Sequence, residues 1–165
     1  MTLEPLISAS PAIQVHVAAA VAAFVLGGVV LFRRKGGRTH MMLGRVWVLL
    51  MLVVVFSSLF IHTIRLWGIW SPIHLLSVGA FVSLVYGVAM IRRRNVSAHK
   101  RTMQGTYLGA LVIAGFFTFM PGRIMHEVLL SGTSPTELAL ICVAAAGLTA
   151  WVIWRGGSHR PTVPA

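Results

Sequence analysis

The stretch AIQVHVAAAVAAFVLGGVVLFRRK, residues 12–35, decides the fold class of this chain. It carries no charged residue from Ala12 to Phe32 and then ends in three consecutive cations. A helix needs about 20 mostly apolar residues to cross the hydrocarbon core of a bilayer. The stretch is therefore predicted to form a transmembrane helix whose carboxyl end reaches a membrane surface.

Four further stretches have the same character, and the composition of the whole chain agrees with them. The chain is 57% hydrophobic and only 10% charged, whereas a soluble domain carries roughly 25% charged residues. We therefore predict an all-α integral membrane protein with five transmembrane helices. The predicted spans cover residues 12–32, 42–63, 73–91, 102–120 and 137–154.

The basic residues predict the orientation of these spans. Of the fourteen Lys and Arg residues, only Arg65 and Arg123 fall on one predicted side, and short cytoplasmic loops are the ones enriched in Lys and Arg. The N-terminus is therefore expected outside the membrane and the C-terminus in the cytoplasm. The residues on the predicted cytoplasmic side are Arg33, Arg34, Lys35, Arg38, Arg45, Arg92, Arg93, Arg94, Lys100, Arg101, Arg155 and Arg160.

The high net charge does not indicate a nucleic-acid-binding protein. A formal charge of +11 would suggest one in a soluble domain, but here the cations flank apolar spans, where topology already requires them. The single cysteine, Cys142, lies inside an apolar stretch, so neither a disulfide framework nor a cysteine metal motif is possible within one chain. The lipid bilayer is the expected environment, and nucleic acid is not an expected partner.

Two segments of the chain look like copies of one helical hairpin. In the first, His16 precedes the cations of 33–35 and His40 follows them; in the second, His74 and His99 flank the cations of 92–94 in the same way. Parallel repeats of this kind are related by a pseudo-twofold axis along the membrane normal. We therefore predict a four-helix bundle made of hairpins 12–63 and 73–121, with one additional helix at 135–155.

The axis would bring the four histidines together as two pairs. His16 and His74 become equivalent near the outer surface, and His40 and His99 near the inner one. Imidazole is a common axial ligand of haem iron, and cofactors in bundles are held by side chains from facing helices. Haem propionates also need cationic partners. The candidates are Arg38, Arg45, Lys100 and Arg101 on the inner side, with Arg65 and Arg123 outside.

The histidine arrangement resembles the di-haem transmembrane cytochromes of the cytochrome b-561 type. That resemblance implies one haem between His16 and His74 and a second between His40 and His99. The intervals from His16 to His40 and from His74 to His99 are shorter here than that family leads us to expect. Because a C-x-x-C-H motif is absent from the sequence, one or two haem b groups would be bound without a covalent link.

A second resemblance is carried by residues 38–47, RTHMMLGRVW, by residues 99–103, HKRTM, and by Arg123. These stretches are similar to a group of bacterial membrane proteins known as domain of unknown function 2306. This resemblance covers most of the chain and implies a multi-pass protein of the bacterial cytoplasmic membrane. It implies no activity.

These features favour a b-type haem protein that moves electrons in the cytoplasmic membrane, either as an oxidoreductase or as an electron-transfer subunit. A quinone and an outer oxidant or reductant are candidate partners, and the oligomeric state is left open. One alternative is a non-catalytic scaffold or assembly subunit of a membrane complex. Another is a metal-ion transporter that uses the histidines as ligands, although no acidic residue lies deep in a predicted span to neutralise a cation.

Overall fold

The computed structural model is helical, and it contains no strand in the residues it describes, which are 3–61, 72–120, 122–130, 136–137 and 140. Three long helices are α2 (Pro11–Phe32), α3 (Arg38–Ser58) and α4 (Pro72–Arg92). They are followed by α5 (Val96–Thr106), the π-helix η1 (Tyr107–Ile113) and α6 (Ala114–Thr118). Two short helices are α1 (Glu4–Ile7) and α7 (Ile124–Leu130).

The helices α2, α3 and α4 are each long and apolar enough to cross a membrane, which confirms a membrane protein with spanning helices. Proline at the first position of α2 suits its start, because the missing N–H has no partner there in any case. The second helix differs from the predicted span 42–63, since α3 begins at Arg38 and ends at Ser58. Its first turn can hold Arg38 because a long cationic side chain reaches water from a helix end.

The fourth predicted span, 102–120, corresponds to a continuous helical segment formed by α5, η1 and α6. This segment begins earlier than predicted because Asn95 caps it, its Oδ1 accepting a hydrogen bond from the backbone N–H of Ala98 at 3.0 Å. Its middle turns form a π-helix over Tyr107–Ile113, a feature with no signature in the composition of the segment. The predicted fifth helix, 135–155, lies almost entirely outside the described residues.

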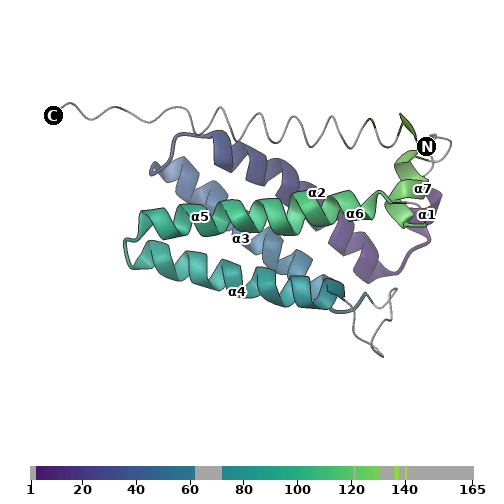
Figure 1. The fold of residues 1–165 in the computed structure, drawn as a ribbon, viewed down its shortest axis with the longest axis horizontal. Helices are drawn as coiled ribbons and strands as arrows, with labels where there is room; N and C mark the ends of the chain where they lie inside the picture. The colour runs from purple at the N-terminus through teal and green to yellow at the C-terminus, as the bar shows by residue number, and fades with distance from the viewer. Residues whose placement is uncertain (1–2, 62–71, 121, 131–135, 138–139, 141–165) are drawn as a thin grey trace.

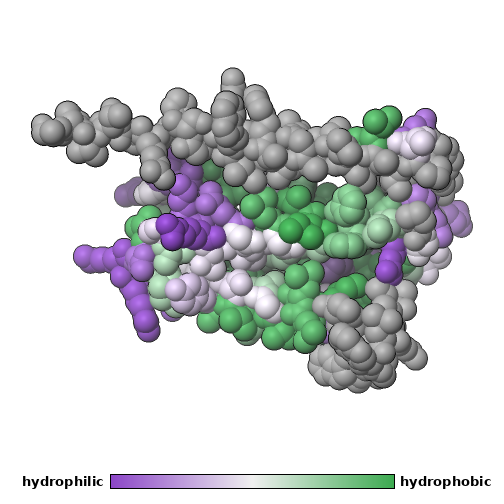
Figure 2. Space-filling model, in the orientation of Figure 1, coloured by the Kyte–Doolittle hydropathy of each residue, from purple (hydrophilic) through white to green (hydrophobic). Residues whose placement is uncertain are grey.

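The long helices form an up-and-down bundle (Figure 1). Around it, α2 packs against α3, α3 against α4, α4 against α5, and η1 closes the ring by packing against α2. In this order α2 and α4 stand at opposite corners, as do α3 and α5. The loops after α2 and α4 lie at the same end, and Figure 2 shows hydrophilic residues gathered there and hydrophobic residues along the middle.

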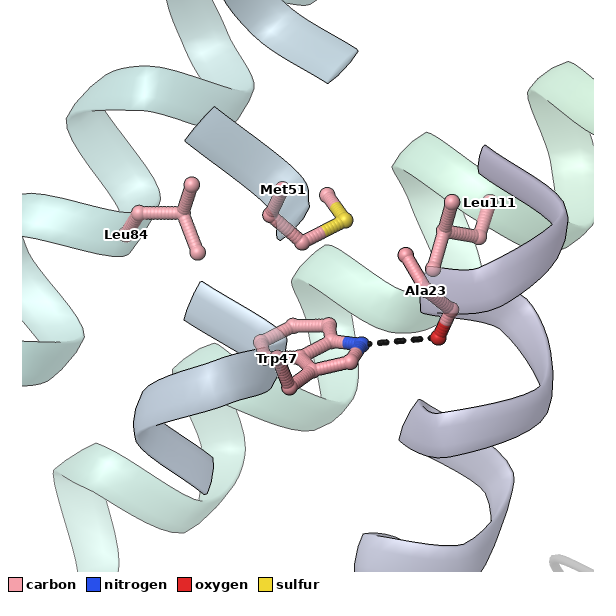
Figure 3. Packing of buried hydrophobic residues seen from close by; sticks show 5 residues of the cluster. All are labelled: Ala23, Trp47, Met51, Leu84 and Leu111. Carbon is pink, nitrogen blue, oxygen red and sulfur yellow. Dashed lines mark hydrogen bonds between the residues drawn. The ribbon is translucent and has the colours of Figure 1, made fainter. Parts of the chain in front are cut away.

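A compact apolar cluster fills the middle of the bundle (Figure 3). Met51 is fully buried at its centre, and the indole Nε1 of Trp47 donates a 3.0 Å hydrogen bond to the carbonyl oxygen of Ala23 on α2. This bond satisfies the one polar atom that a tryptophan brings into an apolar core. The cluster consists of Ala23, Trp47, Met51, Leu84 and Leu111.

Glycine at position 27 allows two aromatic side chains to reach the backbone of α2. A Cβ atom at Gly27 would lie 2.5 Å from Nε1 of Trp47 and 2.6 Å from Cδ2 of Tyr107. The hydroxyl of Tyr107 donates to the carbonyl oxygen of Phe24 at 3.2 Å. The rings of Phe24 and Tyr107 stack with their centroids 5.8 Å apart. The space over this glycine is therefore occupied by the side chains of Trp47 and Tyr107.

Two short helices that the hydropathy pattern did not predict lie at the other end of the bundle. Helices α1 and α7 pack against each other there (Figure 1). The side-chain amide of Gln14 on α2 donates to the carbonyl oxygens of Ile7 at 2.8 Å and Ala9 at 3.0 Å. These contacts fix α1 to the start of α2, so that the end of the bundle near His16 is partly covered.

Candidate functional site

His16 lies on α2 and its ring points toward α3. Its Nδ1 atom is 3.1 Å from the carbonyl oxygen of Val54 and 3.1 Å from the hydroxyl oxygen of Ser57. A carbonyl oxygen can only accept, so Nδ1 carries the proton and Nε2 keeps its lone pair. Metal-ligating histidines commonly donate their other N–H in this way, which sets the tautomer and the ring orientation.

Small polar side chains extend this layer from α3 to α4. The hydroxyl oxygens of Ser58 on α3 and Ser77 on α4 are 2.6 Å apart, and both residues are buried. One turn before Ser77 on α4 lies His74, whose side chain is only 2% exposed. The structure therefore brings His16 and His74 into one polar layer on diagonal helices. We call His16, Ser57, Ser58, His74 and Ser77 the outer layer.

Besides Val54 and Val55 on α3, the buried side chains near the outer layer are small. Ala19 on α2 and Ala80 on α4 are buried, as are Ser58 and Ser77, whereas the bulky residues of the core cluster lie further along the helices. Small residues on facing helices leave room for a flat group to approach the backbone, although they also suit close helix packing. Of the two ends of α2, the one near His16 therefore suits a macrocycle better than the one near Gly27.

His40 and His99 form a second pair at the basic end of the bundle. His40 lies in the first turn of α3 and His99 in the first turn of α5, and the two imidazoles are within range of a direct electrostatic interaction. The Nδ1 atom of His99 donates to the carbonyl oxygen of Gly87 at 2.8 Å, which leaves its Nε2 lone pair available. We call His40 and His99 the inner pair.

The other ring of the inner pair, that of His40, has a nitrogen atom that remains available for coordination. The Nδ1 atom of His40 is buried and has no hydrogen-bond partner among the described residues. Leaving a buried polar atom unsatisfied costs about 1–3 kcal/mol, so such atoms are uncommon unless a ligand, an ion or water completes them. The residues of the inner pair thus fit a group that imidazole nitrogen can ligate.

Two of the arginines expected beside haem propionates, Arg45 and Arg123, are placed differently from each other. Arg45 is exposed on α3, five residues after His40, and five residues correspond to roughly 140° around a helix. It therefore does not share the face of His40. Arg123 is half-buried just before α7, at the end of the bundle that holds the outer layer, so it remains a candidate partner for an anionic group there.

The remaining histidines do not join either pair in the described structure. His126 on α7 donates from Nδ1 to the carbonyl oxygen of Phe119 at 3.0 Å, which links α7 to the end of α6. His62 and His159 lie outside the described residues. No group of three or more His, Cys, Asp or Glu residues that could hold a metal ion occurs within the described part of the chain; six-coordinate haem needs only two opposed imidazoles.

The three serines of the outer layer were not predicted as functional residues. Serine is common in transmembrane helices, and no sequence motif distinguishes Ser57 from the other serines. The one available signal was spacing, because Ser77 follows His74 by three residues and so shares its helix face. Their grouping with His16 depends on how α2, α3 and α4 pack.

An apolar helical bundle with one strongly basic end defines an integral membrane protein. Comparison with known families makes this specific: residues 13–155 match the family described as predicted membrane protein DUF2306. The chain therefore belongs to the DUF2306 family. No curated protein and no solved structure shows significant similarity to it.

Proposed function

We propose that this protein binds haem b through His16 and His74 in the outer layer and through His40 and His99 in the inner pair, and that it carries electrons across the membrane. The observation that supports this most is the way the rings are held. In each pair, one imidazole donates Nδ1–H to a backbone carbonyl of a neighbouring helix, Val54 for His16 and Gly87 for His99. Both rings thereby keep an Nε2 lone pair for a metal.

The arrangement of helices supports the same proposal. The residues of each pair come from opposite corners of the bundle, α2 with α4 and α3 with α5, which is the arrangement needed to ligate one group from both faces. His16 on α2 and the cations that follow this helix, beginning at Arg33, are separated by about 25 Å of helix. Two redox groups at the two ends would therefore divide the membrane into shorter electron-transfer steps.

The chemistry is shared between the group and the protein. Bound haem iron would supply the exchange between ferric and ferrous states. The chain would supply axial imidazoles in a fixed tautomer, an apolar core between the layers, and a cover of α1 and α7 over the outer end. By the positive-inside rule the basic end faces the cytoplasm, which places the inner pair near the cytoplasmic surface and the N-terminus outside.

An optical spectrum of the detergent-purified protein tests haem binding. Expression with added haem precursor should give a Soret band that shifts on reduction with dithionite, with one or two haems for each chain by the pyridine haemochromogen assay. His74→Ala should lower the haem content, whereas His126→Ala should not, since His126 lies outside both pairs. Pure, folded protein without a reducible Soret band would overturn the proposal and leave a scaffold role as the better account.

A further inference from the structure

A groove of about 400 Å³ lies at the basic end of the bundle, where α4 turns into α5. It is separate from the outer layer and contains neither member of the inner pair. Its lining combines one cation with hydroxyl and amide groups. The lining residues are Tyr86, Asn95, Ser97, Ala98, Arg101 and Thr102, and we call this surface the α4–α5 groove.

The groove has the chemistry of an anion site. Ser97 and Arg101 are both exposed and lie one turn apart on the same face of α5. Asn95 uses its Oδ1 atom to cap α5, so its amide N–H groups are the part left to donate. The sequence contains no acidic residue between Glu4 and Glu127. A guanidinium beside neutral donors, with no competing carboxylate, suits the oxygens of a phosphate group.

The position of the groove indicates the source of that phosphate. Val78, Val82 and Val85 on α4 are 49%, 58% and 54% exposed, and at helical spacing they form an apolar stripe that leads toward Tyr86 at the groove. Since α4 can span a bilayer, this stripe would face acyl chains while the groove lies at the level of the headgroups. A free phosphate ion would use the groove but not the stripe.

We propose that the α4–α5 groove binds the phosphate group of an anionic phospholipid, whose acyl chains lie along Val82 and Val85. Arg101 forms the charged contact, and Ser97 donates a hydrogen bond from its hydroxyl. Arg101 is two residues from His99, which is roughly 200° around the helix, so this contact does not engage the inner pair. The site therefore does not depend on whether haem binds.

Native mass spectrometry of the full-length protein in detergent tests this site, with phosphatidylglycerol or phosphatidylcholine added at matched concentrations. Phosphatidylglycerol should bind more tightly than phosphatidylcholine, and Arg101→Gln should weaken it about fivefold, as expected for one cation near anionic lipid. Ser97→Ala should weaken it less. The matched control is Arg33→Gln, which removes the same charge from the other basic loop and should leave this binding nearly unchanged.

Three results would overturn the proposal. Equal binding of the two lipids would show that the groove does not select a headgroup with a net negative charge. An equal loss in Arg33→Gln and Arg101→Gln would show that only overall charge matters. If inorganic phosphate at millimolar concentration displaced phosphatidylglycerol completely, or bound when the lipid did not, the groove would be a free-phosphate site. A thermal melt of each variant confirms that the compared proteins are folded.

Discussion

His16 on α2 lies 3.1 Å, through its Nδ1 atom, from the carbonyl oxygen of Val54 on α3. This contact does more than join two helices. It places the ring proton on Nδ1 and leaves Nε2 free to ligate, and it fixes the ring against α3. The same relationship recurs between His99 and Gly87 at the other end, so the proposed ligands are oriented before any group binds.

The outer layer should lose its haem when either of its histidines is removed. We expect His16→Ala and His74→Ala to lower the haem content to the same extent, because one missing axial ligand leaves a six-coordinate site incomplete. His99→Ala should remove the haem of the inner pair instead, and so a different component of the α-band. Haem quantification with low-temperature spectra of the α-band checks this. Identical spectra for His16→Ala and His99→Ala would contradict the assignment to two separate layers.

The hydroxyl of Ser57 should tune the outer haem without holding it. Ser57→Ala removes one of the two acceptors near Nδ1 of His16, so the imidazole becomes a weaker electron donor and the ferric state is less stabilised. We expect the midpoint potential to rise by tens of millivolts, since about 1 kcal/mol for a hydrogen bond is ~40 mV for one electron. Redox titration measures it, with Ser8→Ala as the control.

An unchanged potential in Ser57→Ala would show that the Val54 carbonyl alone sets the environment of the ring. A loss of haem in this variant would assign Ser57 a structural role. The two results are distinguishable because the first leaves the haem content at the wild-type value and the second does not.

Two adjacent glycines should differ sharply in their tolerance of a methyl group. Gly27→Ala places a Cβ 2.5 Å from Trp47 and 2.6 Å from Tyr107, and overpacking of this kind costs about 1–3 kcal/mol. Gly28→Ala meets only the hydroxyl of Tyr107 at 3.5 Å, which is an ordinary contact. We expect a clear fall in melting temperature for Gly27→Ala and little change for Gly28→Ala.

Tryptophan fluorescence during a thermal ramp in detergent measures this difference, because Trp47 is itself in the affected contact. Equal melting temperatures for the two variants would mean that the aromatic pair moves aside at no cost. The close packing of α2 against α3 and η1 would then be looser than the structure indicates.

The sequence predicted the membrane class and the early helices well because apolar length and flanking charge are local signals. Residues 12–32 coincide with α2 to within one residue. The assignment of histidines as haem ligands remains a prediction. The duplication of the hairpins and the number of spans remain predictions, since the predicted fifth helix lies outside the described residues.

Other features could not be read from the sequence because they arise from contacts between helices. The grouping of Ser57, Ser58 and Ser77 with the histidines depends on the rotation of three helices relative to one another. The π-helix over Tyr107–Ile113 likewise leaves no mark in hydropathy. Arg45 was expected beside the inner pair because it is close to His40 in sequence, but helical rotation separates the two side chains.

The orientation of the bundle can be measured with single cysteines. In a Cys142→Ser background, Gly37→Cys at the start of α3 and Ser8→Cys after α1 place exposed thiols at opposite ends of the bundle. A membrane-impermeant maleimide added to intact spheroplasts should label Ser8→Cys and should label Gly37→Cys only after lysis. The reverse pattern would place the basic end outside and contradict the positive-inside assignment.

Electron transfer across a sealed membrane tests the central claim most directly. Proteoliposomes containing the haem-loaded protein and internal ferricyanide are mixed with external ascorbate as the reductant. A small mediator that cannot cross the bilayer is added outside. The account predicts bleaching of internal ferricyanide well above that of empty liposomes, with His16→Ala and His99→Ala each abolishing the excess. Bleaching no faster than in empty liposomes would contradict it.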